Sequence, residues 1–215
     1  MRAGLGWSGL VAIALLLVGS IVPAVETQPA KPAHSAMATA TAVFAGGCFW
    51  CMEADFEKLP GVISAESGYT GGKTPNPGYE QVSAGVTGHA EAVRVTYDPT
   101  RLSYQQLVDF FWHHIDPTVK DRQFCDVGTQ YRSAIYWQND AERTIAEASR
   151  NALLNSGKLP QVYTEIVAAS AFYPAEEYHQ DYHRKNPIRY AYYRLSCGRD
   201  ARVHEIWDGK QAPYS

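Results

Sequence analysis

The chain has few of the residues that mark several protein classes. It has only four cysteines in 215 residues and no long run of lysine or arginine, and its formal net charge is -3. The low cysteine content excludes a small disulfide-stapled toxin, and the lack of a basic run argues against a surface that follows nucleic-acid phosphates. With 46% hydrophobic residues, the sequence is neither a disordered tail nor a collagen-like fibre. A chain of this length buries a core without disulfides, so its cysteines are available for chemistry.

The first forty residues differ from the rest. An apolar run from Leu10 to Val22 follows a single early positive charge, Arg2, as in secretory signal peptides. Small residues from Ala24 onward offer cleavage points, and the Pro/Ala/Thr-rich stretch up to Ala40 is typical of a flexible linker. No cysteine lies in this segment, which excludes a lipidated cysteine at the cleavage point. We expect an exported protein, in the bacterial periplasm. The alternative is an uncleaved segment that anchors the protein to the inner membrane.

After residue 40 the patterns predict alternating strands and helices. Short apolar or alternating runs predict strands at 42–45, 62–69, 91–97, 131–137 and 161–168. Apolar residues spaced three or four apart predict helices at 48–59, 103–116, 140–156 and 175–184. The first six elements have the order of a split βαβ motif. We therefore expect an α/β, ferredoxin-like two-layer sandwich over residues 41–198 with an extra helix and strand, and an irregular C-terminal tail that includes 199–215.

Two glycines precede a cysteine where the first strand turns into the first helix. The sequence Gly46-Gly47-Cys48 lets the backbone turn sharply and leaves the sulfur of Cys48 open to a substrate. The free N–H groups and the positive dipole at a helix start are expected to stabilise a thiolate, the reactive form. Cys51 lies one helical turn further on, and a disulfide between adjacent turns has no evident structural use. A reactive pair is therefore favoured over a buried cysteine with an incidental neighbour.

A carboxylate and several polar residues accompany this turn. Glu91 shares the parity of the apolar residues in its strand, so burial should raise its pKa and make it a candidate proton donor. The alternative is an edge glutamate in solvent. Asp126 and Tyr131 flank the start of the fourth strand, and Tyr79 follows a proline-rich loop; each of these three is also compatible with a turn or packing role.

The ordered motifs resemble those of the A-type peptide-methionine sulfoxide reductases. The resemblance spans nearly all of the chain after the leader, from Val43 to Cys197. It rests on motifs spread along the sequence: Gly47-Cys48-Phe49-Trp50, Gly68-Tyr69, Tyr79, Gly88-His89-Ala90-Glu91-Ala92-Val93, Tyr97-Asp98-Pro99, Gly128-Thr129-Gln130-Tyr131-Arg132-Ser133 and His179-Gln180-Asp181-Tyr182. The family's fold is a ferredoxin-like sandwich, which agrees with the predicted order of elements.

The resemblance implies a function and a set of roles. Members of the family reduce the S epimer of free or protein-bound methionine sulfoxide, without a metal or organic cofactor, and a thioredoxin supplies the electrons. Cys48 would be the nucleophile and Glu91 the acid. The polar groups around the sulfoxide oxygen would be Tyr79, Asp126 and Tyr131. The methyl group of the substrate would lie against Phe49 and Trp50.

Attack on the sulfoxide would leave Cys48 as a sulfenic acid, and either of two cysteines could resolve it to a disulfide. Many relatives have glycine in place of Cys51 and use a C-terminal cysteine, for which Cys197 is the counterpart. We favour Cys51 because helix geometry fixes it close to Cys48, and a relay from Cys51 to Cys197 remains an alternative. Cys125 is most simply a buried thiol, although pairing with Cys197 is open.

Two other functions compete with a reductase. A general exported thiol–disulfide oxidoreductase would use Cys48 and Cys51 but would leave Glu91 without a role. A non-catalytic module would bind methionine-rich peptides in an aromatic pocket. His179 and His183 lie four residues apart, but no third ligand at a suitable spacing accompanies them, so we expect no metal. We also expect a monomer with no nucleic-acid partner.

Overall fold

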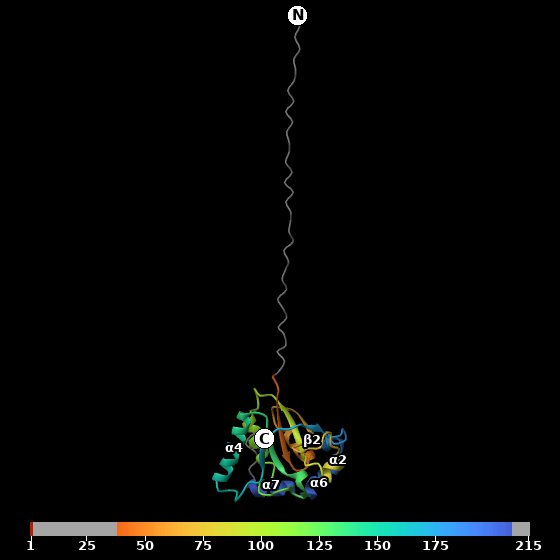
Figure 1. Cartoon of the computed structure of the whole chain (residues 1–215), viewed down its shortest axis with the longest axis vertical. Coiled ribbons are helices and arrows are strands. Elements are labelled where there is room, and N and C mark those ends of the chain that lie inside the picture. The colour runs from red at the N-terminus through yellow and green to blue at the C-terminus, as the bar shows by residue number, and fades with distance from the viewer. Residues whose placement is uncertain (2–37, 208–215) are drawn as a thin grey trace. The chain divides into compact units, whose positions relative to one another are not determined.

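A six-stranded sheet organises the part of the chain that the structure describes. The structure is a computed structural model that describes Met1 and residues 38–207 (Figure 1). The sheet has the spatial order β7-β6-β1-β3-β2-β8. In chain order its strands are β1 (Ala40–Gly46), β2 (Val62–Thr70), β3 (Ala90–Tyr97), β6 (Ser133–Trp137), β7 (Glu165–Ala168) and β8 (Tyr173–Pro174).

Helices and one small hairpin connect these strands. The hairpin joins β4 (Arg122–Gln123) to β5 (Asp126–Val127), and a short 3-10 helix at Thr129–Tyr131 follows it. The α-helices are α1 (Phe49–Phe56), α2 (Tyr79–Ser83), α3 (Tyr104–Trp112), α4 (Asp140–Asn155), α5 (Tyr182–Lys185), α6 (Pro187–Ser196) and α7 (Arg199–Trp207).

The strand order confirms the predicted ferredoxin-like topology. β1 lies between β3 and β6 and is antiparallel to both, and β2 pairs antiparallel with the far side of β3. The predicted extra helix and strand are α4 and β7, and β7 pairs parallel with β6. The short edge strand β8, which pairs with Gly68 and Tyr69 of β2, was not predicted because two residues carry no periodicity.

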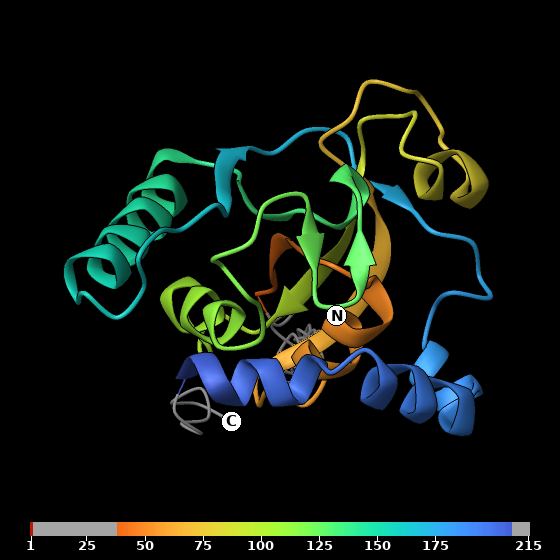
Figure 2. The same cartoon turned by 90° about the horizontal axis from the view of Figure 1, so that it is seen from below.

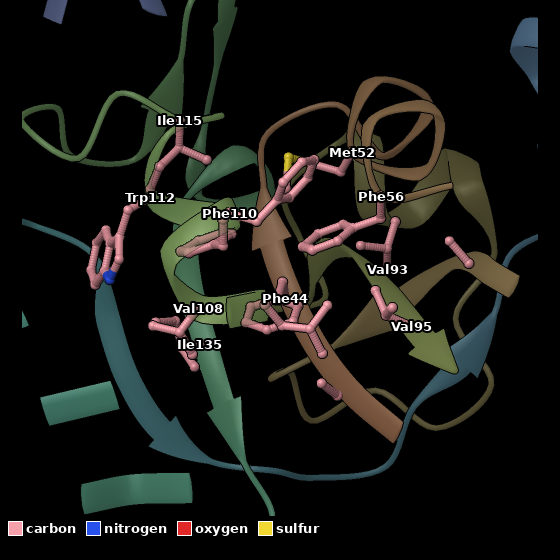
Figure 3. Packing of buried hydrophobic residues seen from close by; sticks show 14 of the residues in the cluster. Phe44, Met52, Phe56, Val93, Val95, Val108, Phe110, Trp112, Ile115 and Ile135 are labelled. Carbon is pink, nitrogen blue, oxygen red and sulfur yellow. The ribbon is translucent and has the colours of Figure 1, made fainter. Parts of the chain in front are cut away.

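The main core fills the space between the sheet and helices α1 and α3. Figure 3 shows Phe44 of β1 among Phe56 of α1 and Val108 and Phe110 of α3. The stripe predicted for the first helix is confirmed, since its four apolar members are buried: Phe49, Met52, Phe56 and Leu59. The alternation predicted in β3 also holds, because Val93, Val95 and Tyr97 belong to this core. Its parity places Glu91 on the same side of the strand.

Helix α3 begins as predicted but ends early. The Ser103 hydroxyl accepts a hydrogen bond from the Gln106 N–H at 3.3 Å, and the Gln106 side chain accepts one from the Ser103 N–H at 2.9 Å. This is the capping box that the spacing predicts. The helix ends at Trp112 rather than reaching Pro117. There the His113 and His114 rings hydrogen-bond the carbonyls of Asp109 and Phe110, which satisfies groups that further helical turns would have used.

The C-terminal region differs from its prediction. No helix spans 175–184; the chain leaves β8 and forms only the short helix α5 there. The segment expected to be irregular is largely helical, with α6 and α7 running along one side of the fold (Figure 2). The reason is a buried cation that the sequence pattern did not reveal. Arg199 of α7 donates to the carbonyls of Gly46 and His114 at 3.2 and 2.8 Å, and Trp207 at the end of α7 is buried in the main core.

The predicted leader and anchor lie outside the described residues. The residues that suggested a signal peptide fall within 2–37, and part of the C-terminal tail falls within 208–215. Within 38–207, no helix has both the length and the apolar character that crossing a membrane requires.

Candidate active site

A small pocket lies where β1 turns into α1. Its volume is about 70 Å³, so it admits only a small group. The pocket brings together seven residues that the sequence singled out, and one that it did not. The lining residues are Cys48, Phe49, Trp50, Tyr79, Glu91, Asp126, Tyr131 and Tyr193.

The turn that presents Cys48 depends on Gly47. Gly47 has a φ of 80°, and a Cβ at this position would lie 2.5 Å from the Cβ of Gln123. Any other residue would therefore combine backbone strain with a clash. The absent side chain lets β4 approach the Cys48 turn closely. Gln123 is itself buried and fixed by hydrogen bonds to the backbone of Asp116, so the hairpin that carries Asp126 stays beside the pocket.

Glu91 enters the pocket from the start of β3. Its side chain is 2% exposed, and its carboxylate accepts a hydrogen bond from the Phe49 N–H at 3.0 Å. Burial raises the pKa of Glu91 to about 8, with smaller contributions from the charges of Asp126 and Cys51, although the Phe49 N–H opposes the rise. The acid is therefore protonated at neutral pH. The prediction of a buried glutamate with a raised pKa agrees with this geometry, and an edge glutamate in solvent does not.

Cys48 and Cys51 are buried free thiols in contact with one another. Burial raises the pKa of Cys48 well above its ordinary value, and the hydrogen bond to Cys51 adds to this effect. A raised pKa keeps Cys48 protonated, whereas the sequence predicted a thiolate at this position. The physical reason is that burial removes water from the sulfur, while the Phe49 N–H at the helix start hydrogen-bonds Glu91 instead of Cys48. The hydrogen bond to Cys48, with the Arg199 and Arg194 guanidinium groups, lowers the pKa of Cys51 to about 7.

Aromatic rings form one wall of the pocket. The Trp50 indole N–H donates to His179 Nδ1 at 3.0 Å, and the indole stacks on Tyr182 with ring centroids 3.7 Å apart. The Phe49 ring lies 5.0 Å from the His179 ring. These contacts fix the orientation of Trp50, so the wall is rigid. His179 thus hydrogen-bonds a residue of α1.

Two tyrosine hydroxyls lie near the acid from separate elements. Tyr79 begins α2, where its N–H donates to Glu176 at 2.8 Å, and Tyr131 ends the 3-10 helix before β6. Burial, followed by the charge of Glu91, raises the pKa of Tyr79 to about 12 and also raises that of Tyr131. Within residues 38–207, neither hydroxyl hydrogen-bonds to another protein group. Both are therefore available as donors to a bound oxygen.

Tyr193 of α6 is a pocket residue that the sequence analysis missed. Its hydroxyl donates to Asp126 Oδ2 at 2.5 Å and also hydrogen-bonds the Cys48 sulfur. This second contact lowers the pKa of Cys48 and so opposes part of the effect of burial. One signal was present in the sequence: Tyr193 lies four residues before Cys197, on the same face of a helix.

The two remaining cysteines form a disulfide, which corrects the expectation for Cys125. Cys125 is exposed and joined to Cys197 across a sequence separation of 72 residues, so it is not a buried thiol. Cys197 ends α6 and is not on an irregular tail. Spacing alone could not show this pairing, because it depends on where the hairpin packs.

Neither cluster of ligating side chains in the described residues is free to hold a metal. In the first, Cys125 and Cys197 are bonded to each other beside Asp126. In the second, Glu53 accepts hydrogen bonds from Ser67 and the Asp181 N–H, and Glu57 pairs with Arg184 at 3.0 Å.

Comparison with known proteins identifies relatives over most of the chain. The family model "Peptide methionine sulfoxide reductase" matches residues 40–211. The peptide methionine sulfoxide reductase MsrA of Bacillus licheniformis is 49% identical over 170 residues, which are 79% of this chain and 94% of that protein. MsrA 2 of Caulobacter vibrioides is 48% identical over 200 residues, 93% of this chain and 97% of that protein.

Solved structures agree with this result. Methionine sulfoxide reductase A of Corynebacterium diphtheriae superposes with a TM-score of 0.63 at 40% identity, covering 69% of this chain and 76% of that one. Mxr1 of Saccharomyces cerevisiae in its reduced form gives a TM-score of 0.64 at 34% identity, covering 69% and 86%. The chain therefore belongs to the peptide methionine sulfoxide reductase family, in its A-type, MsrA branch.

Proposed function

We propose that the enzyme reduces the S epimer of methionine sulfoxide, free or in proteins, in the pocket at Cys48. The observation that carries the proposal is the position of Glu91: an acid that is protonated at neutral pH lines the same 70 Å³ pocket as a buried thiol. Thiol–disulfide exchange transfers no oxygen, so it does not need an acid placed to protonate one. A sulfoxide needs it, because protonation of the oxygen makes the sulfur electrophilic.

The pocket fits the sulfinyl end of the substrate. The rings of Phe49 and Trp50 would supply an apolar seat for the methyl group, and the donors that line the same pocket come from different elements. A protonated Glu91 and the hydroxyls of Tyr79 and Tyr131 would surround the oxygen, with Asp126 held nearby by Tyr193. A pocket that seats the methyl group on rings and the oxygen on donors would distinguish the two epimers, since only one can place both groups correctly.

The chemistry then follows from the thiols. The Cys48 thiol gives up its proton as its sulfur attacks the sulfoxide sulfur, and Glu91 delivers a proton to the oxygen. Methionine leaves, the oxygen stays on Cys48 as a sulfenic acid, and the proton lost by the thiol replaces the one that Glu91 gave. The Cys51 thiol condenses with this sulfenic acid, which forms a disulfide and releases water. Cys51 suits the role because it already hydrogen-bonds Cys48 in the structure.

An external dithiol must return the enzyme to its reduced form. We infer a thioredoxin-like protein that reduces the enzyme disulfide by thiol–disulfide exchange and is itself oxidised. Every electron in this scheme comes from a thiol, so no step requires a metal or an organic cofactor. The scheme also uses only residues of one chain, which is compatible with a monomer.

The location of the enzyme is a further part of the proposal. The apolar run at residues 10–22 supports export to the bacterial periplasm, with the uncleaved membrane anchor as the alternative. The donor would then be an exported or membrane-linked dithiol protein. N-terminal sequencing of the protein from fractionated cells separates a cleaved form from an anchored one.

Turnover of separate epimers tests the function. Purified protein with dithiothreitol should reduce the S epimer of a dabsyl-methionine sulfoxide and leave the R epimer, which serves as the matched control. Failure to turn over either epimer would favour a module that only binds methionine-rich peptides. A Cys51→Ser variant tests the other alternative, because release of one methionine per enzyme should survive in a reductase.

A further inference from the structure

The second cysteine pair lies at the surface in a strained turn. Cys125 is the second residue of the two-residue loop between β4 and β5, and the residue before it, Phe124, has a φ of 53°. A bulky residue rarely adopts this left-handed conformation, and such strain gathers at functional positions. Cys125 is exposed, in contrast to the buried Cys48 and Cys51. A protein reductant can therefore reach the second pair and not the first.

One hydroxyl group separates the two pairs. The Tyr193 hydroxyl hydrogen-bonds the Cys48 sulfur, and it lies 4.0 Å from the Cys197 sulfur on the other side. The Cys197 sulfur is also 4.0 Å from Asp126 Oδ2, in the residue that follows Cys125. The disulfide thus touches two pocket residues. For the Cys197 sulfur to reach the Cys48 sulfur, the Tyr193 side chain has to move aside.

We propose that Cys125 is a fourth redox-active cysteine, and that the Cys125–Cys197 disulfide is the form in which oxidising equivalents leave the buried pocket for the external dithiol. The proposal rests on the reductase function described above. It gives Cys125 a role in recycling the enzyme, and it identifies the chemical group that the protein reductant attacks.

The exchange conserves electrons and protons. Starting from a Cys48–Cys51 disulfide and a reduced second pair, the Cys197 thiolate attacks the Cys48 sulfur, and Cys51 leaves as a thiolate that takes up a proton. The Cys125 thiolate then attacks the Cys197 sulfur, and Cys48 leaves and is protonated. The two protons lost by the outer thiols replace those gained by the inner ones. The inner pair is reduced and the outer pair is oxidised, which is the state that the structure shows.

Electrostatics favour the first of the two exchanges. The hydrogen bond to Cys48, and then the charges of Arg199 and Arg194, lower the pKa of the Cys51 thiol, and a thiol of lower pKa leaves faster in exchange. Arg199 also lies over the Phe124 ring at 4.7 Å, at the base of the loop that carries Cys125. The same cation therefore stabilises the leaving thiolate and supports the loop that receives the oxidising equivalent.

Disulfide mapping after a limited turnover tests the proposal. Fully reduced enzyme receives one equivalent of the S epimer of dabsyl-methionine sulfoxide, without reductant, and is then alkylated and mapped by mass spectrometry. We expect a Cys125–Cys197 disulfide with alkylated Cys48 and Cys51. In Cys125→Ser, the mapped disulfide should still include Cys48. Recycling of this variant by a thioredoxin-like protein should slow at least about tenfold because its oxidised pair is buried. Ser196→Ala, an exposed change beside Cys197, is the matched control and should behave as wild type.

Two results would overturn the relay. One is methionine release that leaves Cys125 and Cys197 as thiols and places the disulfide on Cys48. The other is full recycling of Cys125→Ser by the protein dithiol. Either would show that the Cys125–Cys197 bond only joins the hairpin to α6. Failure of the reductase itself has a different signature, namely no methionine released from either epimer by any variant.

Discussion

The two cysteine pairs of this chain contrast within one site. Cys48 and Cys51 are 6% and 2% exposed and are free thiols, and Cys48 lines the same pocket as the buried acid Glu91. Cys125 and Cys197 form a disulfide at the surface, on a strained loop and at the end of a helix. The inner pair has the groups that activate a sulfoxide, and the outer pair has the access that a protein reductant needs. The contrast suggests that burial divides one redox reaction between two places.

The largest effect should follow loss of the inner sulfur. Cys48→Ser replaces the nucleophile with a hydroxyl that no group in the pocket activates, so release of methionine should fall at least about 10³-fold. Quenched-flow measurement of methionine from the S epimer gives the rate. Ser196→Ala is the control, and a Cys48→Ser variant with more than a tenth of the wild-type rate would place the chemistry on another cysteine.

Removal of the proton donor should come next. Glu91→Gln keeps a hydrogen-bond donor of similar shape but cannot transfer a proton, so methionine release should slow about 10²-fold or more. Alkylation of Cys48 should continue, which separates loss of the acid from loss of the fold. An unchanged rate in the variant would refute the acid role of Glu91.

The pH profile of methionine release should identify the same acid. The active form needs a proton on Glu91 and none on Cys48, and burial places the pKa of Cys48 above that of Glu91. The wild-type rate should therefore rise with pH up to about pH 8, level off as Glu91 loses its proton, and fall only above the pKa of Cys48. In Glu91→Gln the rate should keep rising through pH 8 to the pKa of Cys48, and the later fall should disappear. An alkaline fall that persists in the variant must come from another group.

Alkylation should distinguish the pairs directly. After full reduction, iodoacetamide should modify the exposed Cys125 about tenfold faster than Cys48, because Cys48 is buried and its pKa is raised. Peptide mapping over time gives both rates in one sample. Faster reaction at Cys48 would mean that the inner pair is open in solution.

The smallest effect should come from Tyr193, which positions groups rather than reacting. Tyr193→Phe removes the hydrogen bond to Asp126 and the contact with Cys48, a loss of about 1 kcal/mol, or about fivefold in rate. The apparent pKa of Cys48 from alkylation should rise as well, because Tyr193 lowers it. A purely structural role would change the melting temperature without moving that pKa.

The sequence predicts the inner region well because local patterns determine it. Glycines before Cys48 predict the turn, helical spacing predicts the buried face of α1, and alternation in β3 predicts that Glu91 points inward. The strand order follows from the order of elements. Each of these features depends on residues close together in the chain.

The outer region was less predictable because distant contacts determine it. The Cys125–Cys197 bond joins segments 72 residues apart, and α7 owes its position to buried Arg199, whose partners are backbone carbonyls without a sequence signature. The helix dipole suggested a Cys48 thiolate, whereas the Phe49 N–H is used by Glu91. Burial and competing partners therefore outweighed the local rule.

The central claim is that the Cys48 sulfur accepts the sulfoxide oxygen. A variant with Cys51→Ser and Cys197→Ser lacks both candidate resolving thiols, so the sulfenic acid should persist. After one turnover of the S epimer in the presence of dimedone, mass spectrometry should find the adduct on Cys48, in an amount equal to the methionine released. Methionine release without a Cys48 adduct, or with the adduct on Cys125, would contradict the account.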